Sequence, residues 1–246
     1  MTADQKLKQL HSFESALCKS CHFAKDFIFI KTAVLKYLML TTTILNSLEI
    51  KNKSDLPDLK YCFDLMKKMS MMDHIIEHSI MVKNVADCIC SLLKPLYPEL
   101  DSKLVQVSAL LHDITKTRSF KTGEKHDESG GRLLADLGYN KVGDIIRQHV
   151  VLDEYNNFKA PVTEVEIVNY ADKRVLHHGV VPLVKRLEYI LDKYGKTEEF
   201  CRRINKMWKN TEQLEIKLFK DLDVSPGAIA DLVEKINSSK GTEKKK

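Results

Sequence analysis

The stretch with the clearest chemical character is residues 109–116, where an apolar run ends in His112 and Asp113 and Lys116 follows three residues later. Imidazole and carboxylate groups are common ligands of divalent metal ions, and a nearby ammonium group suits an anionic substrate such as a phosphate ester. A helix end that meets solvent can carry the same residues without any chemistry. The pair therefore predicts a metal site only if further ligands stand at workable positions elsewhere in the chain.

Three more histidines lie on or at the ends of predicted apolar helix stripes. His78 recurs with valine, isoleucine and leucine at spacings of three and four in the helix predicted over 73–93, so its side chain faces the core. His149 ends the apolar stripe of the short helix predicted over 141–149, and His126 begins another helix. Each alone could be an ordinary core imidazole bonded to the backbone.

Asp172 adds a second carboxylate, on the core-facing stripe of the helix predicted over 164–176. An unpaired carboxylate there would be very costly, so a metal ion or a basic side chain is almost demanded. One core rarely needs four histidines and two acids unless a cation binds them. The set therefore favours a metal site.

The elements that position these residues are predicted to be helices. The 246-residue chain is 43% hydrophobic with only 9 Gly and 6 Pro, which is typical of a mostly helical globular protein. Residues 115–125 and 150–161 are expected to be exposed connections. Further helices are predicted over 58–68, from Asp101 to the opening stretch, and over 126–137, 182–193, 197–222 and 227–236.

Composition also divides the chain. We expect residues 1–55 to be an N-terminal helical extension of unknown role, 56–225 to be the main domain, and 226–246 to form a C-terminal helix and basic tail. The formal net charge of +5 is modest and lies partly in that tail, and no broad basic stripe with interleaved aromatics is present. We therefore expect no nucleic-acid partner.

The cysteines and the apolar N-terminal stretch bear on the compartment. Residues 18–22 match the C-x-x-C-H pattern of covalent haem attachment, which would require export. The following apolar stretch, 27–48, holds Lys31 and Lys36, and its uncharged part is too short to span a bilayer; it also lacks the form of a signal peptide. We expect a cytoplasmic protein with reduced thiols and no membrane association.

Taken together, the motifs around His78, the His112-Asp113 doublet and Asp172 resemble the HD-domain metal-dependent phosphohydrolases, most closely the stand-alone members. The pattern of a histidine, a His-Asp doublet and a distant aspartate is matched in order and spacing over about residues 57–222. This resemblance implies an all-α fold, a compact multi-helix HD-domain bundle.

The resemblance implies that His78, His112, Asp113 and Asp172 hold one divalent ion. Members with two ions add histidines between the doublet and the last aspartate. His126 and His149 lie there, and Asp113 could then bridge two ions. One or two ions of Mn, Fe, Co, Ni, Mg or Zn suit such a donor set.

The chain departs from the family pattern at two places. Thr115 stands where many relatives have glycine after the doublet, and Val150 follows His149 where some have another histidine. No Gly-Tyr-Pro motif follows, so we do not expect hydrolysis of cyclic di-GMP of the kind that uses it.

The implied mechanism is attack of metal-activated hydroxide on phosphorus, because a metal ion lowers the pKa of bound water from about 15.7 towards neutrality. Asp113 could also accept the proton of that water. Lys116 and Lys173 could neutralise phosphate oxygens, with Arg147 and Arg174 as weaker candidates.

The predicted substrate is a small-molecule phosphate ester such as a nucleotide. The alternative is a catalytically silent HD module that binds a nucleotide or a partner protein for signalling, although all four core ligands are retained. A purely structural helical bundle is a third possibility. The sequence does not predict which phosphate ester is the substrate, nor the oligomeric state.

Overall fold

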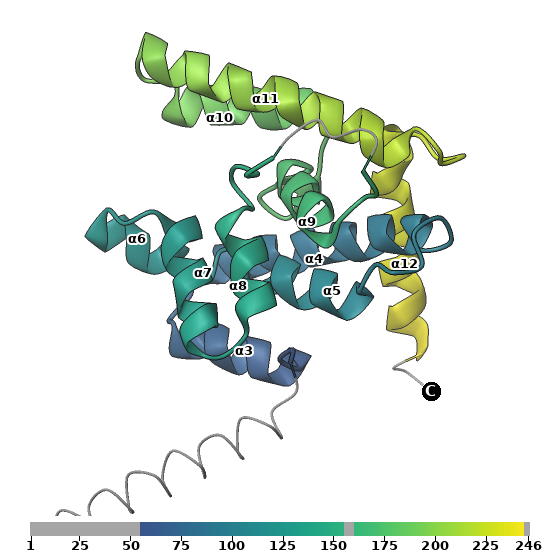
Figure 1. Cartoon of the computed structure of the whole chain (residues 1–246), viewed down its shortest axis with the longest axis horizontal. Coiled ribbons are helices and arrows are strands. Elements are labelled where there is room, and N and C mark those ends of the chain that lie inside the picture. Colours follow the sequence, from purple (N-terminus) through teal and green to yellow (C-terminus); the bar gives the residue numbers. More distant parts are fainter. Residues whose placement is uncertain (1–54, 155–159, 244–246) are drawn as a thin grey trace, which may run out of the picture. The chain divides into compact units, whose positions relative to one another are not determined.

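The computed structural model describes residues 55–154 and 160–243. The predicted extension, the haem-type motif at 18–22, the apolar stretch at 27–48 and the last residues of the tail lie outside the described residues. The described chain is built almost entirely of helices, which confirms the all-α class (Figure 1). The helices and strands are α3 (Leu59–Lys68), α4 (Asp73–Leu93), α5 (Ser102–Leu111), α6 (Lys116–Thr122), α7 (His126–Asp136), α8 (Asn140–Arg147), α9 (Glu164–Lys173), β1 (Val175–Leu176), β2 (Gly179–Val180), α10 (Leu183–Tyr194), α11 (Glu198–Phe219) and α12 (Ile229–Glu243), with a 3-10 turn at Pro226–Ala228.

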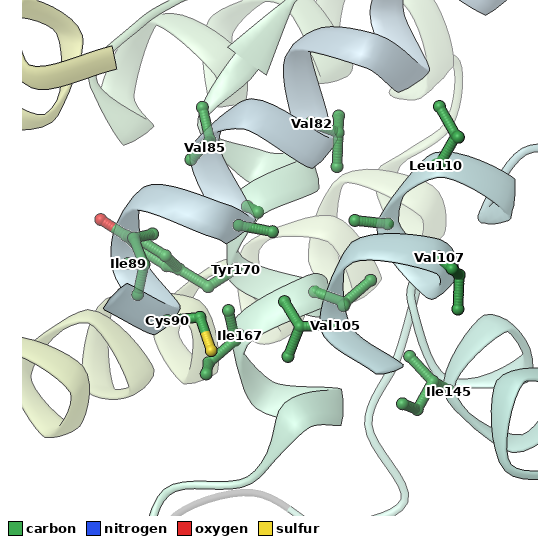
Figure 2. Close-up of a cluster of buried hydrophobic side chains, with 14 of the residues drawn as sticks. Val82, Val85, Ile89, Cys90, Val105, Val107, Leu110, Ile145, Ile167 and Tyr170 are labelled. Atoms are coloured by element: carbon green, nitrogen blue, oxygen red, sulfur yellow. The ribbon is translucent and has the colours of Figure 1, made fainter. Parts of the chain in front are cut away.

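The core lies where α4, α5, α8 and α9 meet, and Figure 2 shows its side chains pointing toward one another from these helices. Fully buried aliphatic residues dominate it, as the periodic stripes predict. Its labelled members include Val82, Val85, Ile89, Val105, Leu110, Ile145, Ile167 and Tyr170. Helices α10 and α11 lie side by side along one edge, and α12 packs against α4 (Figure 1).

Side-chain caps set several of the helix starts. Asp58 accepts a hydrogen bond from the Tyr61 backbone N–H, and Asp101 accepts from two backbone N–H groups at the start of α5. Thr163 and Glu166 form a reciprocal capping box at α9. These caps satisfy donors that the first turn leaves free, so the predicted starts are confirmed to within a residue.

Helices α7 and α8 approach closely because they meet at glycines. A Cβ atom on Gly131 would lie 2.7 Å from the carbonyl oxygen of Gly143, and one on Gly143 would lie 2.5 Å from that of Gly131. Glycine costs about 1 kcal/mol in a helix relative to alanine, and here that cost accompanies backbone-to-backbone contact. The contact brings the end of α8, and with it His149, beside the start of α7.

Two sequence predictions are wrong. Residues 115–125 are not a simple loop, because α6 occupies 116–122 and ends at Gly123 in the left-handed conformation. Since α6 buries no side chain, it has no apolar stripe for periodicity to detect. The helix predicted to reach residue 176 ends at Lys173, because Val175–Leu176 pairs with Gly179–Val180 in a two-stranded antiparallel hairpin.

Among the described residues, no helix combines the length and the apolar character needed to cross a membrane. The described cysteines, Cys62, Cys88, Cys90 and Cys201, are all free thiols.

Candidate metal centre

All six side chains singled out as ligands come together at one place in the bundle. Two groups whose ligand atoms lie within 4.8 Å of one another share His112: one adds His78 and Asp172, the other Asp113 and His149. His126 joins the second group through Asp113. The six residues come from α4, the end of α5, the start of α7, the end of α8 and the last turn of α9.

The first group is arranged around one oxygen of Asp172. Its Oδ1 lies 3.2 Å from His78 Nε2 and 3.7 Å from His112 Nε2. His78 Nδ1 donates to the backbone carbonyl of His177 at 3.0 Å, and His112 Nδ1 donates to that of Ala109 at 2.8 Å. Because a carbonyl only accepts, these bonds place the proton of the neutral ring on Nδ1 and leave Nε2 with a free lone pair toward the cluster.

The second group is arranged around Asp113. Its Oδ1 lies 3.2 Å from His126 Nε2 and 3.6 Å from His149 Nε2, while Oδ2 accepts a hydrogen bond from Lys116 at 2.8 Å. His149 Nδ1 donates to the Ile146 carbonyl at 2.7 Å, so its Nε2 also faces the cluster. Asp113 thus stands between the two groups, as a bridging carboxylate must.

The buried polar atoms show that this cluster fits a cation. His112 Nε2 and Asp113 Oδ1 are both buried, and neither has a hydrogen-bond partner within the described part of the chain. Burying an unsatisfied polar atom is costly, and these two atoms, among the several that are unsatisfied, belong to residues that offer ligand atoms at one point. Imidazole nitrogens together with carboxylate oxygens are donors that divalent transition metals accept.

Charges in the cluster keep the carboxylates ionised. Burial acts to raise the pKa of Asp113, but Lys116 and His112 outweigh it and hold that pKa well below its usual value. Burial likewise acts to raise the pKa of Asp172, and Lys173, His78 and Arg186 hold it well below the usual value. Both acids are therefore negatively charged at neutral pH and attract a cation.

The pKa values of the two most buried imidazoles, His112 and His149, shift in opposite directions. Burial acts to lower the pKa of His112, but attraction to Asp113 and Asp172 outweighs it and raises that pKa. Burial lowers the pKa of His149 to about 4. His149 is therefore neutral at pH 7 and needs to release no proton to accept a metal ion.

The two lysines predicted to contact phosphate, Lys116 and Lys173, differ in their exposure and in their hydrogen-bond partners. The Lys116 side chain is 24% exposed and sits at the edge of the cluster on Asp113. Lys173 is only 2% exposed, donates to the His149 carbonyl and lies 3.4 Å from Asp172 Oδ2, so its ammonium group is directed at the protein. Arg147 pairs with Asp144 and Asp153, and Arg174 donates to Tyr170 and to backbone carbonyls; both are engaged outside the cluster.

Sequence reasoning missed Arg186. Its Nη2 lies 3.5 Å from Asp172 Oδ1, and no candidate site residue after Arg174 was predicted from the sequence. The signal was present, because Arg186 stands between Leu183 and Ile190 on the inward stripe of α10. An arginine on such a stripe needs a partner, as an aspartate does.

The His/Asp cluster that could hold a metal ion lies inside a helical bundle, and comparison with known proteins matches this part of the chain to a family model. Residues 75–175 match the family model described as the HD domain, and that span includes all six clustered residues from His78 to Asp172. This match covers less than half of the chain and shows that residues 75–175 are similar to an HD domain.

Two individual proteins are similar to the chain. A tRNA (cytidine(56)-2'-O)-methyltransferase of Thermoplasma volcanium is 30% identical over 168 residues, which are 63% of this chain and 46% of that protein. The chain thus spans less than half of that relative. The crystal structure of a predicted HD superfamily hydrolase from an uncultured Thermotogales bacterium superposes with a TM-score of 0.40 at 20% identity, over 63% of this chain and 87% of the other.

Proposed function

We propose that the protein is a metal-dependent phosphohydrolase that acts on a nucleotide or a related phosphate ester. One observation carries this proposal: four imidazoles and two ionised carboxylates converge, and the buried ligand atoms His112 Nε2 and Asp113 Oδ1 have no hydrogen-bond partner among the described residues. A divalent ion bound to both atoms would offset the cost of burying them unsatisfied. The similarity of residues 75–175 to the HD domain supports the same proposal.

The clustered residues have different roles in the proposed reaction. His78, His112, Asp113 and Asp172 would hold one divalent ion, and Asp113, His126 and His149 would hold a second. A bound divalent ion supplies activation of water, whose pKa it lowers from about 15.7 towards neutrality. Lys116 lies at the exposed edge and would contact a phosphate oxygen, while Lys173 positions the end of α8 by holding the His149 carbonyl.

The donor set is harder than that of a cysteine-rich zinc site, so Mn, Fe, Co, Ni and Mg join Zn as candidates. We propose a small-molecule substrate, no nucleic-acid or membrane partner, and a cytoplasmic location. Residues 56–225 would be the catalytic domain. The methyltransferase name of the Thermoplasma relative describes a longer protein, and the His/Asp cluster bears on phosphate chemistry, not on methyl transfer.

The alternative is an HD module that binds a nucleotide or a partner without turnover. The complete set of predicted ligand residues argues against such a silent module. A module without turnover has no need to keep both carboxylates ionised beside four histidines. A deciding experiment combines elemental analysis of the purified full chain with a hydrolysis panel of nucleoside monophosphates, dinucleoside polyphosphates, cyclic nucleotides and a chromogenic phosphodiester.

The double variant His112→Ala/Asp113→Ala should lose both metal and turnover. His74→Ala is the matched control, because His74 is exposed one turn before His78 on the same helix and should change neither. Wild-type protein with bound metal and no turnover on any substrate would favour the binding module. Wild-type protein with no bound metal, and a double variant that changes nothing, would refute the proposal.

A further inference from the structure

Arg186 reaches the metal-ligand cluster from α10, a helix that contributes no ligand to it. Its contact with Asp172 is a charge contact at 3.5 Å, longer than the roughly 2.7–2.9 Å typical of a charge-assisted hydrogen bond. The side chain is only 11% exposed, and its buried Nε has no hydrogen-bond partner among the described residues. The Nε–H group is therefore a donor that the described residues do not satisfy.

Aromatic packing holds this guanidinium group in place. Its Cζ lies 5.7 Å from the ring centroid of Tyr189 on the same helix. The Tyr189 ring packs edge-on against His177, whose backbone carbonyl accepts the hydrogen bond from His78. Arg186 is thus connected through Tyr189 and His177 to the candidate metal ligand His78.

The position of Arg186 conflicts with a metal ion unless an anion is present. Asp172 Oδ1, which Arg186 faces, is also the oxygen nearest to His78 and His112. A divalent ion held by these three residues would take that oxygen and leave the guanidinium group beside a like charge. An anion that contacts both would relieve this repulsion, and phosphate oxygens match the planar donors of arginine.

A second cationic side chain, that of Lys116, contacts the other candidate ligand carboxylate, Asp113. Lys116, at the start of α6, donates a hydrogen bond to Asp113 Oδ2 at 2.8 Å. Arg186 and Lys116 are therefore partly exposed cations on two different ligand carboxylates. Lys173, the third nearby cation, already donates to the protein backbone.

We propose that Arg186 is a substrate-binding residue that, with Lys116, binds a terminal dianionic phosphate, so that the substrates are phosphomonoesters. This inference rests on the proposed function and narrows its substrate class. A terminal phosphate carries two negative charges and three free oxygens, enough for a metal ion and two cations. A phosphodiester offers one charge and two free oxygens, and it satisfies the two cations less well.

The test measures binding of inorganic phosphate and of dimethyl phosphate to the manganese-loaded full chain at pH 8 by titration calorimetry. Wild-type protein should bind phosphate more tightly than dimethyl phosphate. Arg186→Met should weaken phosphate binding at least tenfold, change dimethyl phosphate binding little and retain the manganese content of the wild type. Arg186→Lys should cause an intermediate loss of phosphate affinity, because lysine keeps the positive charge but lacks the planar set of N–H donors of the guanidinium group. Lys185→Gln is the control, since it removes a mostly exposed charge one residue away.

Three results would overturn the inference. Unchanged phosphate binding in Arg186→Met, or in Arg186→Lys if the methionine variant does not fold, would leave Arg186 as a partner of Asp172 only. Loss of manganese in the folded variant would make it a positioning residue for the metal ligand. Equal binding of the two probes by wild-type protein would remove the monoester preference. If the wild-type chain retains no metal, the proposed function itself fails, which elemental analysis detects separately.

Discussion

The hydroxyl group of Thr115 donates a 2.8 Å hydrogen bond to the backbone carbonyl of His126 and accepts one from Ser129 at 3.0 Å. Thr115 stands at the position predicted to differ from the glycine of many relatives, and its φ of −104° requires no glycine. Its side chain ties the segment after the His-Asp doublet to the first turn of α7, which carries His126.

Replacing Thr115 with valine keeps the shape of the side chain and removes both bonds. A neutral hydrogen bond contributes about 1 kcal/mol, so we expect affinity at the His126 side of the metal centre to fall roughly fivefold. Metal titration of the purified variant measures this, and Thr115→Ser, which keeps the hydroxyl, should bind as wild type. Equal affinities for the valine and serine variants would show that the tether does not position His126.

Removing individual histidines should separate one-ion from two-ion binding. His126 lies against Asp113, whereas His78 lies against Asp172. If two ions bind, His126→Ala should lose one of them and keep the other, and Asp113→Ala should lose both because it lies between the groups. Elemental analysis of each variant gives the ratio of metal to protein. A wild-type ratio of one that His126→Ala leaves unchanged would restrict the centre to a single ion.

The sequence predicts the position of a residue where that residue shares a helix face with a stripe of apolar residues, and it predicts little where no such stripe exists. The inward positions of His78, His149 and Asp172 could be read from helical periodicity, since each shares a face with apolar residues. Helix α6 and the hairpin at 175–180 could not, because the first buries nothing and the second has strands of only two residues. Arg186 could have been found by the stripe argument applied to Asp172, since charge on an inward face needs a partner whatever its sign.

The glycine contact between α7 and α8 predicts a specific sensitivity. Gly131→Ala places a methyl group 2.7 Å from the Gly143 carbonyl, which must force the helices apart. Overpacking of this kind costs about 1–3 kcal/mol, measured by urea unfolding, and the shift of α8 should also weaken metal binding through His149. Gly227→Ala is the control, because its methyl group would meet only the Ser225 hydroxyl at 3.7 Å. A Gly131→Ala variant as stable as the control would contradict the close approach.

The buried pair between Lys217 of α11 and Glu166 of α9 should govern stability and not activity. Lys217 Nζ donates to both carboxylate oxygens, at 2.7 and 2.9 Å, and Glu166 also caps α9. Lys217→Met leaves a buried carboxylate unpaired and should cost about 3–5 kcal/mol of unfolding free energy. The double variant Glu166→Gln/Lys217→Met should recover much of that loss, because glutamine is neutral and still serves in a capping box. A double variant no more stable than Lys217→Met would show that the unpaired charge is not the cause.

The thiol of Cys62 predicts how stability changes at high pH. Burial, aided by the charge of Asp58, raises its pKa from the ordinary 9.0 to about 12. Below pH 9 the thiol is protonated in both the folded and the unfolded chain, so it has no effect on stability. Between pH 9 and 12 only the unfolded chain releases the proton, so stability falls as pH rises, by up to about 1.4 kcal/mol per pH unit. Urea unfolding of wild type and Cys62→Ala at several pH values from 7.5 to 11 should show a shallower decline in the variant, because other groups that titrate in this range act equally on both. Parallel declines would mean that water reaches the thiolate in the folded protein, and that Cys62, although it has no exposed surface, does not lie in a rigid core.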